Sequence, residues 1–155
     1  MMLDLAFTHV ALFVSDLDAS IEFYQRYAAM KVVHQRTEES GGRTAWLCDG
    51  KLPFVLVLIS ESRRPPRRTI LAVLSRYLPP AMHVGIACES SQEVDELCEL
   101  GRREGRLRKP PRDAGPVVGY YGIVADPDGF DVEFSYGQVI GPDFVGGRSD
   151  GATGN

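Results

Sequence analysis

FTHVALFVSDLDASIEFYQR at residues 7–26 and AMHVGIACE at residues 81–89 are two similar stretches that predict a repeated fold. Residues 7–14 are rich in β-branched and aromatic side chains, which predicts a strand. A helix is predicted next, because Ser15 or Asp16 can cap its first turn. Apolar side chains recur at helical spacing, so one stripe of this helix should face a core. The stripe consists of Leu17, Ile21, Tyr24 and Ala28.

The second stretch repeats this order of elements. A shift of 74 residues places His9 on His83. The same shift places Ile21 on Asp95, so the repeat is weak in identity. A second helix is predicted after residue 89 from the capping box that Ser90 and Glu93 form. The other predicted strands are residues 30–36, 42–50, 52–60, 120–127 and 130–137. This pattern predicts two copies of one βαβββ unit.

The connecting segments follow ordinary turn chemistry. Asp49-Gly50 predicts a hairpin, and Asp-Pro-Asp-Gly at residues 126–129 predicts a tight turn. Residues 61–80 predict a polar, proline-interrupted loop with a short helix, and residues 106–119 a loop with a strand near its start. We therefore expect a single domain over residues 1–138, with modules at about 5–60 and 81–137. Residues 139–155 are expected to form a flexible tail.

The composition excludes several classes of function. The 155 residues carry a net charge of -4, which does not favour a nucleic acid or an anionic membrane surface as partner. The three cysteines lack C-x-x-C spacing and are interpreted as free thiols. Neither a signal peptide nor a stretch long enough to span a membrane is recognised. A cytoplasmic protein that acts on a small molecule is expected.

Three polar residues lie in predicted strands where the pattern favours apolar side chains: His9, His83 and Glu133. A single strand histidine is usually a core or surface residue, and a strand glutamate usually faces water. The two histidines, however, occupy the same place in the repeat. Two imidazoles and one carboxylate suit Fe(II), Mn, Ni, Co or Zn and leave positions open for a substrate.

The quoted stretches, with DPDGFDVEF at residues 126–134, resemble the vicinal oxygen chelate superfamily over residues 5–137. It contains glyoxalase I, extradiol dioxygenases, fosfomycin-modifying enzymes, methylmalonyl-CoA epimerases and bleomycin-resistance proteins. The resemblance implies an α+β fold in which paired βαβββ modules form a cupped, partly closed mixed sheet around a divalent metal. It also implies the metal ligands His9, His83 and Glu133, and a homodimer.

The chain departs from the pattern of each branch of that superfamily. Many members have a fourth ligand, Glu or Gln, in the last strand of the first module, where Val57 or Ile59 stands here. Glu61 lies just beyond and is a poor substitute. Extradiol enzymes have a tyrosine at the place of Ile123, and fosfomycin enzymes a threonine at the place of Ala11. Bleomycin-binding members lack the metal ligands altogether.

The resemblance therefore implies a metal-dependent enzyme with a dioxygenase-like, three-ligand site, for which Fe2+ is favoured over Mn2+, Ni2+, Co2+ or Zn2+. The alternatives are a glyoxalase-type lyase or isomerase and a non-catalytic protein that binds a small molecule such as an antibiotic. No residue is assigned as the catalytic acid or base. His34 is either a proton-transfer group facing the cup or an exposed histidine at the end of a strand.

Overall fold

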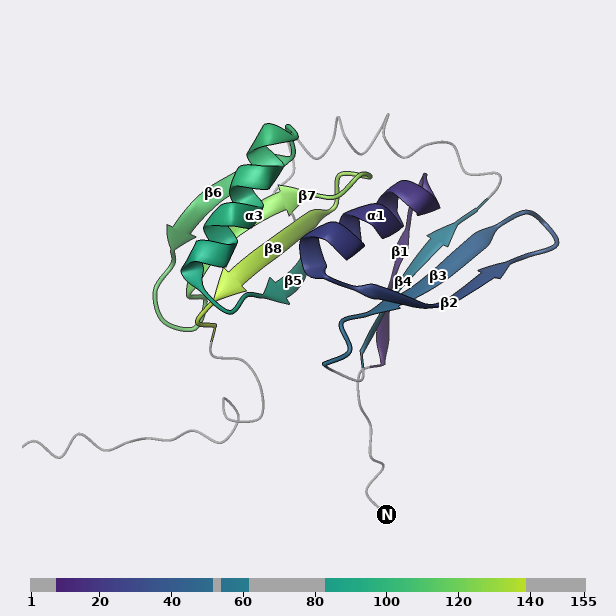
Figure 1. Ribbon diagram of the computed structural model, residues 1–155, viewed down its shortest axis with the longest axis horizontal. Helices are drawn as coiled ribbons and strands as arrows, with labels where there is room; N and C mark the ends of the chain where they lie inside the picture. Colours follow the sequence, from purple (N-terminus) through teal and green to yellow (C-terminus); the bar gives the residue numbers. More distant parts are fainter. Residues whose placement is uncertain (1–7, 52–53, 62–82, 139–155) are drawn as a thin grey trace, which may run out of the picture. The chain divides into compact units, whose positions relative to one another are not determined.

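The computed structural model describes residues 8–51, 54–61 and 83–138. Two open, four-stranded mixed sheets, each accompanied by a helix, make up this part of the chain (Figure 1). The predicted α+β class and the repeated βαβββ order are confirmed. Among the described residues there is no helix of the length and apolarity that a membrane crossing requires. The predicted short helix within residues 61–80 and the tail 139–155 lie outside the described residues.

Two compact units are distinguished, one comprising residues 1–83 and 125–131 and the other residues 84–124 and 132–155. The first contains β1 (His9–Phe13), α1 (Leu17–Ala28), β2 (Lys31–Thr37), β3 (Arg43–Cys48) and β4 (Val55–Ser60). Their sheet has the order β1-β4-β3-β2, with β1 parallel to β4 and the other pairs antiparallel.

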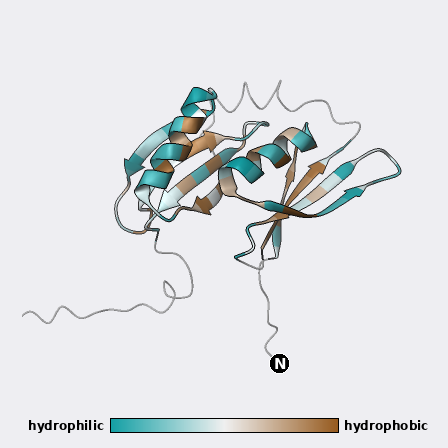
Figure 2. Cartoon of the chain, viewed as in Figure 1, coloured by the Kyte–Doolittle hydropathy of each residue, from teal (hydrophilic) through white to brown (hydrophobic). Residues whose placement is uncertain are grey.

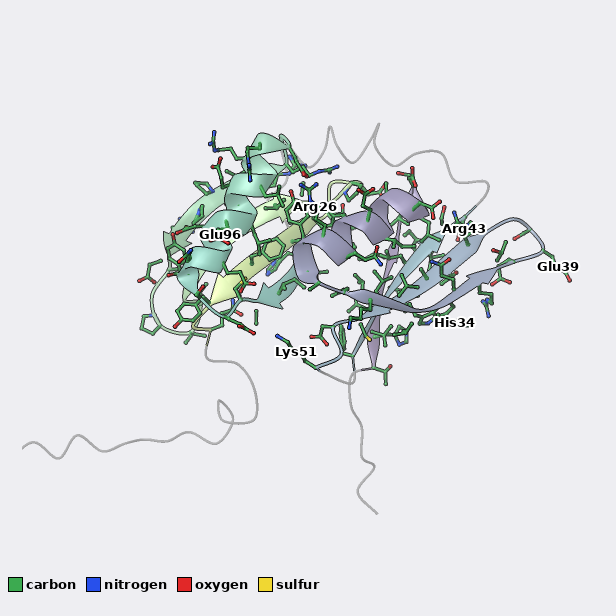
Figure 3. All side chains as sticks on the ribbon, viewed as in Figure 1. Arg26, His34, Glu39, Arg43, Lys51 and Glu96 are labelled. Atoms are coloured by element: carbon green, nitrogen blue, oxygen red, sulfur yellow. The ribbon has the colours of Figure 1, made fainter. Side chains whose placement is uncertain are left out.

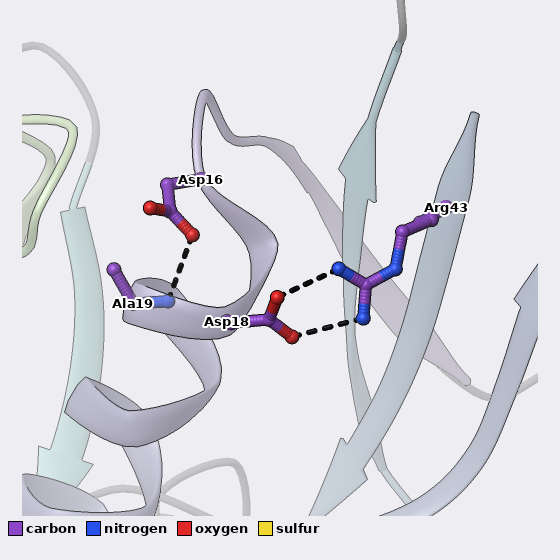
Figure 4. Close-up of polar contacts among 4 residues, drawn as sticks. All are labelled: Asp16, Asp18, Ala19 and Arg43. Carbon is purple, nitrogen blue, oxygen red and sulfur yellow. Dashed lines mark hydrogen bonds and ion pairs between the residues drawn. The ribbon is translucent and has the colours of Figure 1, made fainter. Parts of the chain in front are cut away.

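Helix α1 begins at the predicted cap. Asp16 accepts a hydrogen bond of 3.0 Å from the Ala19 N–H, which satisfies one of the free amides of the first turn (Figure 4). Arg43 of β3 makes a bidentate ion pair with Asp18, with N–O distances of 2.7 and 2.9 Å. The pair lowers the pKa of Asp18 and joins the start of the helix to the sheet.

One face of the first sheet packs against α1, which contacts β3 and β4. The predicted stripe is buried at Leu17, Ile21 and Tyr24, while Ala28 is only half-buried. Phe23 and Tyr27 are also buried and stack with their ring centroids 4.4 Å apart, so the apolar face of α1 is wider than predicted. From the strands, Ala45, Leu47, Leu56 and Leu58 complete the core, each at most 2% exposed.

The second sheet has the order β5-β8-β7-β6. The elements are β5 (His83–Ala87), α3 (Ser91–Arg103), β6 (Leu107–Asp113), β7 (Tyr120–Ala125) and β8 (Asp131–Tyr136). Ser90 Oγ accepts from the Glu93 N–H at 3.1 Å, as the capping box predicts. Gly101 and Gly122 allow α3 to lie close to β7, because a Cβ at either position would collide with Val124 or Cys98, respectively. Figure 2 shows that both helices carry hydrophilic as well as hydrophobic residues around their axes.

Strand β6 is longer than the predicted strand at the start of residues 106–119. It contains Pro110 and Pro111, which cannot donate to a ladder, and its register with β7 shifts around them. The two prolines are tolerated because β6 is the edge strand, which has a neighbouring strand on one side alone. The three cysteines are free, as predicted.

Candidate metal centre

His9 is the first residue of β1 and its side chain is exposed. The hydroxyl of Thr8 lies 2.9 Å from Nδ1 and holds the orientation of the ring. A partner at Nδ1 is typical of metal-binding histidines, because it directs Nε2 toward the metal. This neighbour was not recognised in the sequence, where an adjacent threonine carries no distinctive signal.

Glu133 occupies the middle of β8 and is only 8% exposed. The alternation of the strand separates it from Val132 and Phe134, which are fully buried. Gln138 Nε2 donates a hydrogen bond of 2.8 Å to Glu133 Oε1. Glu133 therefore does not face water, in contrast to most glutamates in strands.

His83 begins β5, which is the neighbour of β8 in the second sheet. Its side chain is exposed and alternates with the more covered Val84. The two strands that carry His83 and Glu133 are thus adjacent, whereas His9 belongs to the first sheet. Within the described residues, no group of three His, Cys, Asp or Glu side chains stands close enough to hold a metal ion. The donor types nevertheless fit a divalent metal, since two imidazoles and one carboxylate are ligands of Fe, Mn, Ni, Co and Zn.

Each module contains an equivalent main-chain hydrogen bond, and this bond identifies the position at which many superfamily members have a fourth ligand. In the first module the Val14 N–H donates to the Ile59 carbonyl at 2.9 Å, and in the second the Cys88 N–H donates to the Ser135 carbonyl at 2.7 Å. Val57 and Glu133 each lie two residues before the accepting residue. Val57, 6% exposed, is therefore the structural counterpart of Glu133, and it cannot bind a metal.

The turn between β7 and β8 is attached to the start of the first module. Asp128 accepts from the Ser15 N–H at 3.0 and 3.1 Å and also bonds the Ser15 hydroxyl. Asp126 is 1% exposed and accepts bonds from the Tyr24 hydroxyl at 3.1 Å and from the amides of Asp128 and Phe130. Burial raises the pKa of Asp126 to about 6, against the lowering effect of these donors.

The two tyrosines that begin β7, Tyr120 and Tyr121, lie on opposite faces of the strand. Tyr120 donates a hydrogen bond of 2.6 Å to Asp95 of α3, which raises the pKa of its hydroxyl, so its ring lies on the helix side. The hydroxyl of Tyr121 accepts from Arg112 at 2.6 and 3.1 Å on the other side. Tyr121, not Tyr120, therefore shares a face with Ile123, the place of the extradiol tyrosine.

The chain is similar to known proteins over most of its length. An uncharacterized protein of Pseudomonas aeruginosa, PA2024, is 37% identical over 137 residues, which cover 87% of this chain and 91% of the relative. A solved structure of a possible glyoxalase from Bacillus cereus matches with a TM-score of 0.61 and 25% identity, over 84% of this chain and 98% of that one.

Two more distant structures share the fold. The fosfomycin resistance protein FosX of Listeria monocytogenes, solved with Mn(II), matches with a TM-score of 0.64 at 19% identity, over 89% of this chain and 96% of that one. Glyoxalase I of Leishmania major matches with a TM-score of 0.62 at 22% identity, over 86% and 87%. The model of the Glyoxalase/Bleomycin resistance protein/Dioxygenase superfamily matches residues 6–134, and the chain belongs to this superfamily.

Proposed function

We propose that this chain is a divalent-metal-dependent enzyme that binds two adjacent oxygens of a small substrate through a metal held by His9, His83 and Glu133. Fe2+ is the favoured metal and a dioxygenase-like reaction the favoured chemistry. The observation that carries the proposal is the buried carboxylate of Glu133, which accepts a hydrogen bond from Gln138. Glu133 lies on β8, the strand next to the one that carries His83.

Each proposed ligand has a defined part in the binding. His9 would bind through Nε2, because Thr8 occupies Nδ1. Glu133 would supply the negative charge, and its burial would strengthen the attraction to a cation. Three protein ligands leave coordination positions for two substrate oxygens. When bound, the metal would act as a Lewis acid on those oxygens.

The counterpart of Glu133 distinguishes this proposal from a lyase or isomerase. Those members of the superfamily have a fourth metal ligand at this place that also serves the proton transfer, and Val57 can neither bind a metal nor transfer a proton. A three-ligand site is what remains for this chain. The fosfomycin resistance protein whose fold it shares was solved with Mn(II), which supports the proposal of a divalent metal on this scaffold.

Metal analysis of the purified protein tests the proposal. The wild type should contain about one equivalent of metal, or take it up when Fe(II), Mn(II), Ni(II) or Zn(II) is added anaerobically. His83→Ala should lose it, whereas His34→Ala should keep it, because the chain has three histidines and His34 is the one not proposed as a ligand. A wild type that retains none of these metals would sink the proposal.

The His83→Ala variant also separates an enzyme from a non-catalytic binder. In a metal enzyme, His83→Ala loses metal and activity together. In a hydrophobic binding protein, the variant keeps most of its affinity for the bound molecule.

We further propose that the chain pairs as a homodimer, which light scattering of the eluted protein would show as twice the 17.1 kDa chain mass.

A further inference from the structure

A β-bulge in β2 changes the side to which His34 points. Val32 pairs with Leu47 and His34 with Trp46, so Val33 is an extra residue between two consecutive pairs. Simple alternation would place His34 on the same face as Val32, whose partner Leu47 is fully buried. The bulge instead places His34 on the opposite face of the sheet, the one away from α1. Bulges re-aim side chains in this way and are frequent near functional sites.

The registers of the first sheet show that this is also the face of His9. His34 is paired with Trp46, Trp46 with Val57, and Val57 with Ala11. Residues in register share a face, and His9 lies two residues before Ala11 on the same strand. The face away from α1 therefore has His9 on strand β1, at one edge, and His34 on strand β2, at the other.

The edge at β2 carries a cluster made of the Trp46 indole, the His34 imidazole and the Arg36 guanidinium. The ring centroids of His34 and Trp46 are 4.9 Å apart, tilted by 55°, and the Arg36 guanidinium lies 5.9 Å from the Trp46 centroid. His34 and Arg36 are exposed and both can donate hydrogen bonds, while Arg36 also pairs with Glu38 (Figure 3 labels His34 on β2). A planar group with an acceptor oxygen suits this edge, because it can stack on the aromatic rings and accept hydrogen bonds from His34 and Arg36.

The space beside the cluster is sufficient for such a group. A cavity of about 650 Å³ has Arg36 of the cluster in its lining, together with Glu38, Ser40, Gly42, Arg43, Thr44, Ile59, Ser60 and Glu61. Arg36, Thr44 and Ile59 form the next row of the same face, since Arg36 pairs with Thr44 and Thr44 with Ile59. The partly exposed Val55 and Ile59 and the exposed Ala11 make the middle of the face apolar.

The separation of the two edges sets the length of a molecule that reaches both. Strands β1 and β2 are three inter-strand steps apart in the order β1-β4-β3-β2, which is roughly 14 Å along the sheet at about 4.8 Å per step. A three-carbon substrate bound at His9 could not reach His34. An extended molecule with an apolar middle could.

We propose that His34, Trp46 and Arg36 form a specificity subsite for the far end of an elongated substrate, and that this end is a planar, acidic aromatic group. The inference rests on the proposed function, since the other end of the substrate would be the pair of vicinal oxygens at the metal. The substrate class is then an aromatic acid joined through an apolar segment to a diol, catechol or similar group.

The single tryptophan of the chain reports directly on this subsite, because Trp46 is the only residue of its kind. The probe is 2-naphthoate, a planar aromatic acid without vicinal oxygens, and binding is followed by Trp46 emission and by calorimetry. It should bind with and without chelator, since the subsite contains no metal ligand. A catechol joined by a five-carbon chain to benzoate should bind at least about tenfold more tightly than catechol alone.

The variants compare two faces of one strand. His34→Ala and Arg36→Gln should each weaken 2-naphthoate at least about fivefold, and His34→Gln, which keeps a donor, should weaken it less. Gln35→Ala is the matched control, because Gln35 is also exposed but pairs with Ala45 on the face toward α1. It should change the affinity by less than about twofold. Circular dichroism checks that each variant is folded.

The outcomes separate this inference from the proposed function. If no metal is bound but 2-naphthoate still quenches Trp46 and depends on His34, the metal proposal is wrong and the subsite stands. If metal and catechol bind while 2-naphthoate leaves Trp46 unchanged, the subsite is overturned and the metal proposal stands. Equal effects of His34→Ala and Gln35→Ala would also overturn the subsite.

Discussion

Val57 of β4 is the structural counterpart of Glu133 of β8. In each module, the amide that follows the first strand donates a hydrogen bond to a carbonyl of the last strand. Val57 and Glu133 each lie two residues before the residue that provides this carbonyl. Both side chains are buried, yet one is apolar and the other is a carboxylate. The repeat therefore preserved the backbone while the two modules kept different chemistry at the same place.

Val57→Glu should restore a fourth ligand. Without metal the variant should be less stable, because it buries an unpaired carboxylate. With Mn(II) or Zn(II) it should recover stability and bind the metal at least about tenfold more tightly than the wild type. Thermal unfolding and competition with a chelating dye measure both effects. Ile59→Glu is the control one row away on the same face, and an equal gain there would refute the assignment of Val57.

Gln138→Ala should weaken metal binding without removing a ligand. Gln138 holds the Glu133 carboxylate at 2.8 Å, and loss of such a supporting hydrogen bond typically costs about 10- to 100-fold in metal affinity. The measurement is a competition titration with the same dye. Gln92→Ala removes a similar bond of 2.8 Å, to Glu96 on the exposed face of α3, and should leave the affinity unchanged.

The stability of the fold should depend on the ionisation of Asp126. Burial raises its pKa to about 6, so the folded protein holds the proton more tightly than the unfolded chain, in which the pKa is near 3.8. The stabilising contribution of the protonated form is complete below about pH 4 and is lost as the pH rises through 6. The loss amounts to roughly 2 to 3 kcal/mol in the free energy of unfolding.

Asp126→Asn is the variant that tests this dependence. An amide cannot ionise, and its oxygen can still accept from the amides of Asp128 and Phe130. The difference in free energy of unfolding between wild type and variant should therefore fall from pH 4 to pH 6.5 and then level off. Urea unfolding at four pH values measures it. A difference that is constant or rises over this range would contradict the raised pKa.

Gly122→Ala should destabilise the packing of α3 on β7. A Cβ at this position collides with the Cys98 sulfur, and overpacking of this kind costs about 1 to 3 kcal/mol. Gly85→Ala is the control in the same sheet, because a Cβ there meets no atom within 4 Å. Cys98→Ala introduced together with Gly122→Ala should recover part of the loss, which chemical denaturation can measure.

Local patterns were sufficient to predict most of the fold. The spacing of Leu17, Ile21 and Tyr24 and the caps at Asp16 and Ser90 depend on neighbours within a few residues, so both helices were located correctly. The prolines of β6 obscured the length of that strand, because their acceptability depends on the edge position of β6 in the sheet, which is a property of the tertiary structure.

For the candidate site, too, some features could be predicted from local sequence and others depend on the tertiary structure. The equivalent places of His9 and His83, the position of Glu133 in a closing strand and the superfamily could all be inferred from the amino-acid sequence. Three features became visible in the folded chain alone: Glu133 is buried and held by Gln138, Val57 rather than Ile59 is its counterpart, and a bulge turns His34 to the face of His9. These features were not predictable because strand periodicity gives the two faces of a strand but not its register. Register depends on hydrogen bonds between strands that are distant in the chain.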